Sequence, residues 1–405
     1  NIDALTIDND YYWLLGKYSV QSPYNGKKGY VNTSVPLYYL KWEKATTLNF
    51  GLDLGLLNNR VNFLVDYFIR DIYDKLADQR IPISTGFSSV KINNGTLQNR
   101  GIEIEANFKV INTDNIKWNI GANFTRIRSF VKKLPYNGND NNRIGGQEIW
   151  DPSNPTQTMY VGGRQEGERV GDDLVVGYQD EGVYHNQAEL EADKDRKIQF
   201  YAGTIPTANR KPIVGDTRWK DVNGDGIIDS RDRVVLGRTT PDFIGGFTTD
   251  FTYKNINLFV KTDYAVGHLI NNAVRTRGIS QVQGNMNWTS EIKDTWTPEN
   301  PNANIPRYDF TDPRGNHKAG GEGQYSASSR YWEKGDYLAL REITLSYNLP
   351  GAAVNNAFKD IRLFVSGTNL AYFTKYTGYS PEKGGWDNGR FPLPRSFTFG
   401  INATF

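Results

Sequence analysis

Residues 47–71 read TLNFGLDLGLLNNRVNFLVDYFIRD, which is two alternating runs that flank an Asn-Asn pair. Every second residue from Leu48 to Leu56 is apolar, and the same holds, with one Tyr, from Val61 to Ile69. Side chains of a β-strand point alternately to its two faces, so each run predicts a strand with one apolar face. So short a link between two such runs predicts a β-hairpin.

The same alternation returns along the whole chain. At the C-terminal end, Phe397, Phe399, Ile401, Ala403 and Phe405 alternate with small or polar residues. The other clear runs are GIEIEANFKV (101–110), IKWNIGANFTRI (116–127), GGFTTDFTYK (245–254), INLFVKTDYAVG (256–267), YLALREITLSYNL (337–349) and IRLFVSGTNLAYF (361–373). Two weaker candidates lie near 157–165 and 172–179. The sequence therefore predicts about eleven strands, each close to the length of a membrane-spanning β-strand.

The lengths of the connections predict how these strands are arranged. Short and long links alternate along the chain, which in an up-and-down antiparallel sheet places all the short turns at one end. Outer-membrane barrels have this form, with tight periplasmic turns and long outer loops. We expect an all-β, antiparallel transmembrane β-barrel; the alternative is a soluble β-domain whose strands face a core. The short links lie near 58–60, 111–115, 166–171, 254–255 and 350–360, and the long links near 72–98, 130–156, 180–242, 268–336 and 374–394.

Composition removes several classes of function. Only 38% of the residues are hydrophobic, and no run approaches the roughly 18 apolar residues of a membrane helix. The 47 basic and 45 acidic residues are interspersed, so we expect no nucleic-acid partner. The absence of Cys removes disulfides, zinc-thiolate sites and thiol nucleophiles. The opening NIDALTIDND has no signal-peptide pattern, so we expect either a mature chain or a piece of a longer one.

Residues 221–232, DVNGDGIIDSRD, begin like the calcium-binding loop of an EF-hand. Several carboxylates on one short loop repel one another unless a hard cation lies among them, which favours Ca²⁺. Asp232 replaces the usual bidentate Glu and the flanks are too short for EF helices, so we expect a weak, structural ion rather than a calcium sensor. The alternative is a solvated turn without metal, since Asp, Asn and Gly favour turns in any case. The candidate ligands are Asp221, Asn223, Asp225, the backbone carbonyl of Ile227, Asp229 and Asp232.

No residue pattern predicts catalysis. His185, His268 and His317 lie far apart in expected loops, without a partner at metal-ligand or triad spacing, so we expect them at the surface. Glu103 and Glu105 alternate with isoleucines, which places them on the polar, lumen-facing side of a strand rather than in a glycosidase site. The chain also lacks the nucleophile-elbow and phosphate-loop motifs, and we expect a protein that is not an enzyme.

Tryptophans in the expected loops are candidate contacts for a substrate. A flat aromatic ring offers a large apolar area to a sugar ring with little loss of entropy. A tryptophan in a barrel can equally anchor the protein at the membrane interface, and the sequence leaves both roles open. The tryptophans concerned are Trp150, Trp288, Trp296, Trp332 and Trp386.

Five blocks of the chain carry a family resemblance through both their content and their order. They are LKWEKATTLNFGLDLGLLNNRVNFLVDYFIRDIYDKL (40–76), NNGTLQNRGIEIEANF (93–108), WKDVNGDGIIDSRDRVVLGRTTPDFIGGFTTDFTYKNINLFV (219–260), YLALREITLSYNLP (337–350) and LFVSGTNLAYFTKYTGYSPE (363–382). With the terminal Phe405, they resemble the SusC/RagA-type TonB-dependent transporters of the Gram-negative outer membrane. The resemblance extends over essentially the whole chain.

The resemblance implies a 22-stranded barrel filled by an N-terminal plug, to which residues 1–405 would contribute the C-terminal strands. No segment resembles the plug, the TonB box or the N-terminal strands, so we expect these in a longer polypeptide or in a second chain.

The resemblance also implies an activity, partners and a location. These are TonB-driven import of a bulky nutrient, either an oligosaccharide or an oligopeptide, together with a SusD-like surface lipoprotein. The loop 180–242, which carries the DxNxDG motif, would be extracellular. The alternatives are a passive porin or an outer-membrane secretion or adhesion barrel, and a soluble, cation-stabilised, secreted glycan-binding β-protein.

Overall fold

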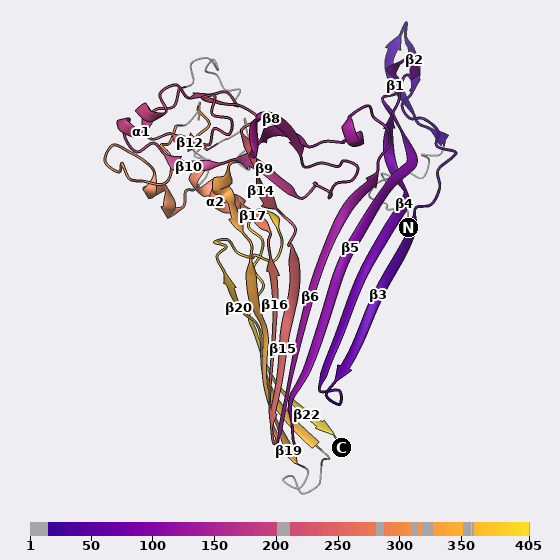
Figure 1. Ribbon diagram of the computed structural model, residues 1–405, viewed down its shortest axis with the longest axis vertical. Coiled ribbons are helices and arrows are strands. Elements are labelled where there is room, and N and C mark those ends of the chain that lie inside the picture. Colours follow the sequence, from indigo (N-terminus) through magenta and orange to yellow (C-terminus); the bar gives the residue numbers. More distant parts are fainter. Residues whose placement is uncertain are drawn as a thin grey trace.

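One large antiparallel sheet dominates the computed structural model, which describes residues 15–200, 211–280, 287–309, 314–317, 327–350, 358 and 360–404. Within these residues the sheet has nine strands, in the order β22-β20-β19-β16-β15-β6-β5-β4-β3 (Figure 1). The strands are β3 (Lys44–Leu56), β4 (Val61–Arg80), β5 (Ser89–Asn112), β6 (Ile116–Lys133), β15 (Phe243–Tyr253), β16 (Ile256–Val266), β19 (Tyr337–Pro350), β20 (Asp360–Thr374) and β22 (Ser396–Thr404). The prediction of an antiparallel, all-β wall is confirmed.

The register gives the sheet one continuous apolar face. In-register partners of neighbouring strands project to the same side, so a row of partners shows the character of that face. Large apolar side chains on it stay exposed, as for Phe399 at 79%, and an exposed apolar surface of this extent marks contact with a membrane. One row across all nine strands is Leu56, Val61, Phe108, Ile120, Thr249, Val260, Ile343, Gly367 and Phe397.

The opposite face of the sheet is polar. Glu103 is in register with Asp66, and Glu105 is in register with Asn123, so both glutamates lie on this face, as predicted. In a transmembrane barrel a polar face opposite a lipid-facing one surrounds the lumen. One polar row across all nine strands is Gly55, Asn62, Asn107, Gly121, Thr248, Lys261, Glu342, Thr368 and Ser396.

Short connections lie at one end of the sheet and long ones at the other, where the chain forms a separate outer layer (Figure 1). The short turn 57–60 between β3 and β4 holds Leu57, Asn58 and Asn59 at φ of 53°, 55° and 59°. This left-handed backbone is tolerated best by Asn and Gly, which explains the Asn-Asn pair in the sequence.

Two predictions about the connections are wrong. The segment 72–98 is mostly strand, because β4 and β5 stay paired as far as Arg80 and Ser89 and only residues 81–88 connect them. The candidates near 157–165 and 172–179 also lie outside the wall. β8 (Asn154–Val161) pairs with β7 (Gln147–Asp151), and β9 (Leu174–Tyr178) pairs with β14 (Arg233–Arg238), each in its own two-stranded sheet.

The second correction, which removes two strands, leaves nine in the wall of the described residues, against the eleven or so predicted. The expected short link 166–171 is therefore internal to a single long connection between β6 and β15, which also contains the segment 180–242. Removing two adjacent strands leaves the up-down direction of every later strand unchanged, so the predicted separation of short and long links persists except at the outer connection 81–88, which is short.

The remaining elements are short. The outer layer contains β10 (Asp180–Val183), α1 (Gln187–Ala192), β11 (Lys197–Ile198), β12 (Thr217–Trp219), β13 (Ile227–Ile228), β17 (Leu269–Asn272), α2 (Ala273–Ser280), β18 (Trp332–Lys334) and β21 (Gly385–Asp387), with 3-10 turns at Ile83–Thr85, Asp140–Asn142, Ser290–Asp294 and Ser329–Tyr331. β1 (Tyr18–Tyr24) and β2 (Lys27–Asn32) form a hairpin. None of the helices in the described ranges is both long and apolar enough to cross a bilayer. The expectation for Phe405 lies outside the described residues.

Aromatic rings lie over glycines on the polar face. Phe68 is in register with Gly101, and a Cβ added to Gly101 would overlap the ring of Phe68. Phe364 and Gly400 repeat the arrangement at the other edge of the sheet. The ring covers the backbone that a glycine leaves bare, a known way to stabilise strand glycines.

Gly101→Val is expected to lower the free energy of unfolding by about 1–3 kcal/mol, because the branched side chain occupies the place of the Phe68 ring. Urea unfolding of the folded barrel in lipid vesicles measures the change. In a Phe68→Ala background the same substitution should cost nothing further. An equal cost in both backgrounds would show that the ring is not the reason for the glycine.

Candidate functional site

The outer layer is a folded unit with its own small core. The buried cluster consists of Tyr178, Ile198, Trp219, Ile228 and Ala327, which come from distant parts of the chain. Phe200 packs against this cluster, with its ring centroid 4.3 Å from that of Tyr178. The outer connections therefore present a defined surface above the lumen rather than a set of independent loops.

Asp216 joins two of the outer connections. It is 1% exposed, and Asn316 donates a hydrogen bond of 2.9 Å to its Oδ1. Arg307 Nε lies 3.0 Å from the same oxygen, and Arg314 Nε lies 3.6 Å from Oδ2. Burial raises the pKa of Asp216, while the hydrogen bonds from Asn316 and Ile213 and the two arginines oppose the rise. A buried carboxylate is retained only with such partners.

A second buried ion pair joins Arg330 and Asp180. Arg330 Nη2 is 2.5 Å from Asp180 Oδ2, and the backbone N–H of Asp180 donates to Ser329 Oγ at 2.9 Å. These contacts join the segment before β18 to the strand β10. The long connections on either side of β15 and β16 are thus linked by polar contacts as well as by the apolar core.

A third ionic group links the outer layer to the polar face of the wall. Arg341 of β19 contacts Asp263 of β16, and its Nη2 lies 2.5 Å from Glu382 Oε1 in the connection after β20. Arg341 Nη1 also donates to the Tyr372 hydroxyl at 3.1 Å. One guanidinium therefore holds two strands and an outer loop together, using several of its fixed donors.

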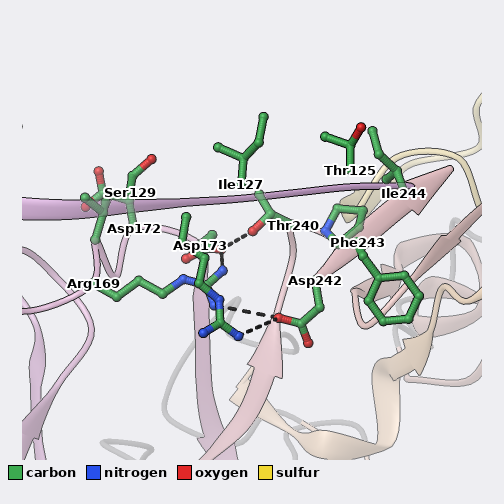
Figure 2. Close-up of a pocket in the computed structure, with 13 residues that line it drawn as sticks. Thr125, Ile127, Ser129, Arg169, Asp172, Asp173, Thr240, Asp242, Phe243 and Ile244 are labelled. Atoms are coloured by element: carbon green, nitrogen blue, oxygen red, sulfur yellow. Dashed lines mark hydrogen bonds and ion pairs between the residues drawn. The ribbon is translucent and has the colours of Figure 1, made fainter. Parts of the chain in front are cut away.

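A cavity of about 390 Å³ lies where β6 and β15 part at the outer end of the wall. Pairing between the two strands ends at Thr125 and Ile244, and the bridge between Phe130 and Arg169 then covers the edge of β6. Figure 2 shows Arg169 and Asp242 pointing toward one another below β6. The cavity marks the joint between wall and outer layer.

The DxNxDG loop is closed by its own hydrogen bonds. Asp221 accepts the N–H groups of Gly224 and Gly226, both at 2.8 Å. Asp232 is fully buried and accepts from the N–H groups of Val222 at 2.9 Å and Asp229 at 2.7 Å. Burial, together with the charges of Asp229 and Asp221, raises the pKa of Asp232 to about 6. The two ends of the loop are thus joined by one carboxylate.

The predicted calcium ligands divide into two groups. Asp229 pairs with Arg231 at 2.8 Å, and Asp232 accepts hydrogen bonds from two backbone N–H groups, so both side chains already have protein partners. Asn223 and Asp225 lie side by side, joined by a hydrogen bond of 2.8 Å. With Asp221 and the carbonyl of Ile227, these two are the oxygen donors that suit Ca²⁺. In the described part of the chain, no group of three or more acidic or histidine side chains is close enough together to hold a metal ion.

The histidine predictions are partly wrong. His268 and His317, expected at the surface, are 1% and 2% exposed. His268 Nε2 lies 2.9 Å from the carbonyl oxygen of Pro381, so it helps to pack an outer loop. His185 does have an acidic neighbour, because its Nδ1 is 3.3 Å from Glu189 Oε2.

The five predicted tryptophans have different environments. The Arg231 guanidinium lies over the ring of Trp150, 4.3 Å from its centroid. Trp296 Nε1 donates a hydrogen bond of 3.3 Å to the His185 carbonyl. Trp332 and Trp386 form an edge-to-face pair with centroids 6.4 Å apart. Trp288 and Trp386 are the most open, at 49% and 47% exposed. Sequence reasoning missed the ion pairs of Asp216, Asp180 and Arg341, and no spacing signal could have revealed them.

Fold and site together define a segment of an outer-membrane β-barrel, with a lipid-facing side, a polar lumen side and a structured outer layer. Residues 6–162 match the family model described as TonB dependent receptor-like, beta-barrel. Two curated relatives are TonB-dependent receptor P3 of Formosa agariphila, 31% identical over 90% of this chain and 34% of its own length, and TonB-dependent receptor SusC of Bacteroides thetaiotaomicron, 27% identical over 93% and 34%. The chain thus spans about a third of the length of these relatives.

The solved structure titled "Structure of the RagAB peptide importer in the 'open-open' state" has the same fold. It aligns with a TM-score of 0.69 at 21% identity, over 98% of this chain and 38% of that one. The chain thus forms barrel strands similar to those of TonB-dependent receptors of the outer membrane, among them SusC. This family is one of transport proteins rather than enzymes.

Asp216→Ala is expected to lower the free energy of local unfolding of the outer layer by about 3–5 kcal/mol. The substitution removes the buried carboxylate that balances the charges of Arg307 and Arg314. Hydrogen exchange of the backbone amides at 213–219 and 314–317 measures the change. The control Asp172→Ala removes an exposed pair with Arg164 and should cost less than about 1 kcal/mol. Equal effects of the two substitutions would contradict a special role for the buried pair.

Proposed function

We propose that this chain forms the C-terminal strands of a TonB-driven importer that carries a bulky nutrient across the outer membrane. The observation that supports this most strongly is the register, which gives nine strands one apolar and one polar face beneath a folded outer layer. A passive porin needs an open mouth, whereas here the outer connections have a core of their own. The fold and the family fit an importer better than a pore.

The cargo that fits the surface best is an oligosaccharide or an oligopeptide. The half-exposed rings of Trp288 and Trp386 offer stacking surfaces in the outer layer. The polar face supplies amide, hydroxyl and carboxylate groups for a hydrated cargo. A relative's structure is titled a peptide importer, which supports the peptide alternative.

A SusD-like surface lipoprotein is the partner that we propose for the outer layer. The ion pairs of Asp216 and Asp180 keep this layer in one shape, as a docking surface requires. The TonB complex would act through parts of the receptor other than these strands.

Energy coupling gives the test of import. Uptake of fluorescently labelled oligosaccharides and oligopeptides is measured in cells that carry the native receptor, with and without a functional TonB. We expect uptake to be lost without TonB, since an importer needs this energy input and a porin does not. Uptake that persists unchanged would favour the porin.

Affinity purification of the receptor in detergent tests the proposed partner. The lipoprotein is expected to remain bound to the receptor.

We also propose a weak, structural Ca²⁺ ion at the DxNxDG loop. Asp221, Asn223, Asp225 and the Ile227 carbonyl would hold it, while Asp232 closes the loop from beneath. The ion would offset the repulsion among the carboxylates and stiffen the turn.

Asp221→Asn combined with Asp225→Asn is expected to abolish Ca²⁺ binding, because it removes both carboxylates of the exposed turn. Isothermal titration of the native receptor with Ca²⁺ should give a Kd of about 10⁻⁴–10⁻³ M, as for other weak extracellular sites. Asp172→Asn, in a separate exposed pair, serves as the control and should leave binding unchanged. A native receptor that binds no Ca²⁺ in this range has a solvated turn instead.

A further inference from the structure

Three arginines lie on the apolar, lipid-facing side of the wall near its outer end. Arg100 of β5 is in register with Arg128 of β6, and Arg126 of β6 is in register with Ile102 of β5. Arg100 is also in register with Ile69 of β4, a residue of the apolar face. Since in-register partners project to the same side, all three arginines point away from the lumen.

The three arginines lie just beyond the outer end of the apolar belt, which is the run of apolar side chains on the lipid-facing side of the wall. Phe124, two residues before Arg126 on β6, packs against Phe243 of β15 with ring centroids 5.5 Å apart. Two residues of a strand advance the chain by about 7 Å, and aromatic residues mark the membrane interface of a barrel. Arg126 and Arg128 therefore lie where the polar headgroups of the outer leaflet meet the protein.

Protein carboxylates balance only part of this positive charge. Among the described residues the Arg126 guanidinium has no hydrogen-bond or ion-pair partner. Arg128 Nη2 is 3.9 Å from Asp242 Oδ1, but Asp242 is shared with Arg169 at 3.7 Å. The cluster thus has room for a negative group supplied from outside the protein.

Arg100 strengthens this conclusion. Its Nε donates 2.5 Å to the neutral side chain of Gln98, and its guanidinium lies 4.9 Å from the ring centroid of Phe130. Neither partner carries a negative charge, and the nearby Asp71 accepts a hydrogen bond of 2.7 Å from Gln98. Arg100 also lies in register with Arg128, and like charges in register destabilise a sheet unless an anion comes between them.

We propose that Arg100, Arg126 and Arg128 bind the phosphate group of an anionic lipid in the outer leaflet. A guanidinium matches a phosphate with two parallel hydrogen bonds, and the neighbouring apolar belt takes the acyl chains. The lipid-facing position selects a membrane phosphate over a soluble one. The proposal concerns the outside of the wall and does not rest on the import function.

The test compares lipid binding by the native receptor and by R100Q/R126Q/R128Q, counted by native mass spectrometry after exchange into phosphatidylcholine nanodiscs. The added probes are phosphatidic acid, which carries a phosphate monoester, and diacylglycerol, which lacks it. Each arginine near a membrane surface contributes about fivefold in affinity, so the triple variant should bind phosphatidic acid about a hundredfold more weakly.

A matched control removes the same charge from the polar face. Arg70, Lys117 and Lys261 are exposed on that side, in register with Thr47, Thr252 and Thr248. The variant R70Q/K117Q/K261Q should keep the phosphatidic acid affinity of the native protein. The heat-dependent gel mobility of the folded barrel shows that each variant is assembled.

Three outcomes would overturn the proposal. The first is equal binding of phosphatidic acid and diacylglycerol by the native receptor, and the second is an equal loss of phosphatidic acid binding in both triple variants. The third is competition by inorganic phosphate at the concentration of the lipid, since this would assign the arginines to a soluble anion. Retention of the lipid by the native and control proteins, with its loss from R100Q/R126Q/R128Q, supports the site.

Discussion

The pairing of backbone groups is the constraint on which the rest of this structure depends. In hydrocarbon no water is available to a free N–H or C=O, and each unpaired group costs several kcal/mol. The nine-stranded antiparallel ladder pairs these groups strand by strand from β22 to β3. Once the ladder is fixed, every second side chain must face lipid and the others must face the lumen. The two faces of the wall, and the turns that preserve its register, follow from that requirement.

The same constraint explains what the sequence could reveal. The wall was predictable because a strand with lipid on one side and water on the other needs an apolar residue at every second position, as between Leu48 and Leu56. The outer parts of β4 and β5 escaped prediction because register shifts at Ile72, Lys75 and Leu76 interrupt the alternation. Beyond the membrane, neither face needs to be continuously apolar, so strands can continue without the pattern that identifies them.

The outer layer was not predictable, for a different physical reason. Its stability comes from contacts between residues far apart in the chain, such as Asp216 and Asn316, which are 100 positions apart. Its strands are short, and β11 and β13 have only two residues each, too few for a periodic signal. The DxNxDG motif was visible because its loop geometry is local. The hydrogen-bond partners of Asp232, which are two backbone N–H groups, depend on the surrounding fold.

Wall and outer layer are therefore stabilised by different means and meet at particular residues. The wall depends on its hydrogen-bonded ladder in lipid, and the layer depends on a small apolar core and buried ion pairs in water. Arg341, which holds Asp263 and Glu382 together, is one such meeting point. Arg341 is partly buried, with 20% of its side chain exposed, and departure of Glu382 would leave its guanidinium with Asp263 as the remaining carboxylate partner. Movement of that outer loop is thus coupled to the polar face of the wall, which is where a cargo would pass.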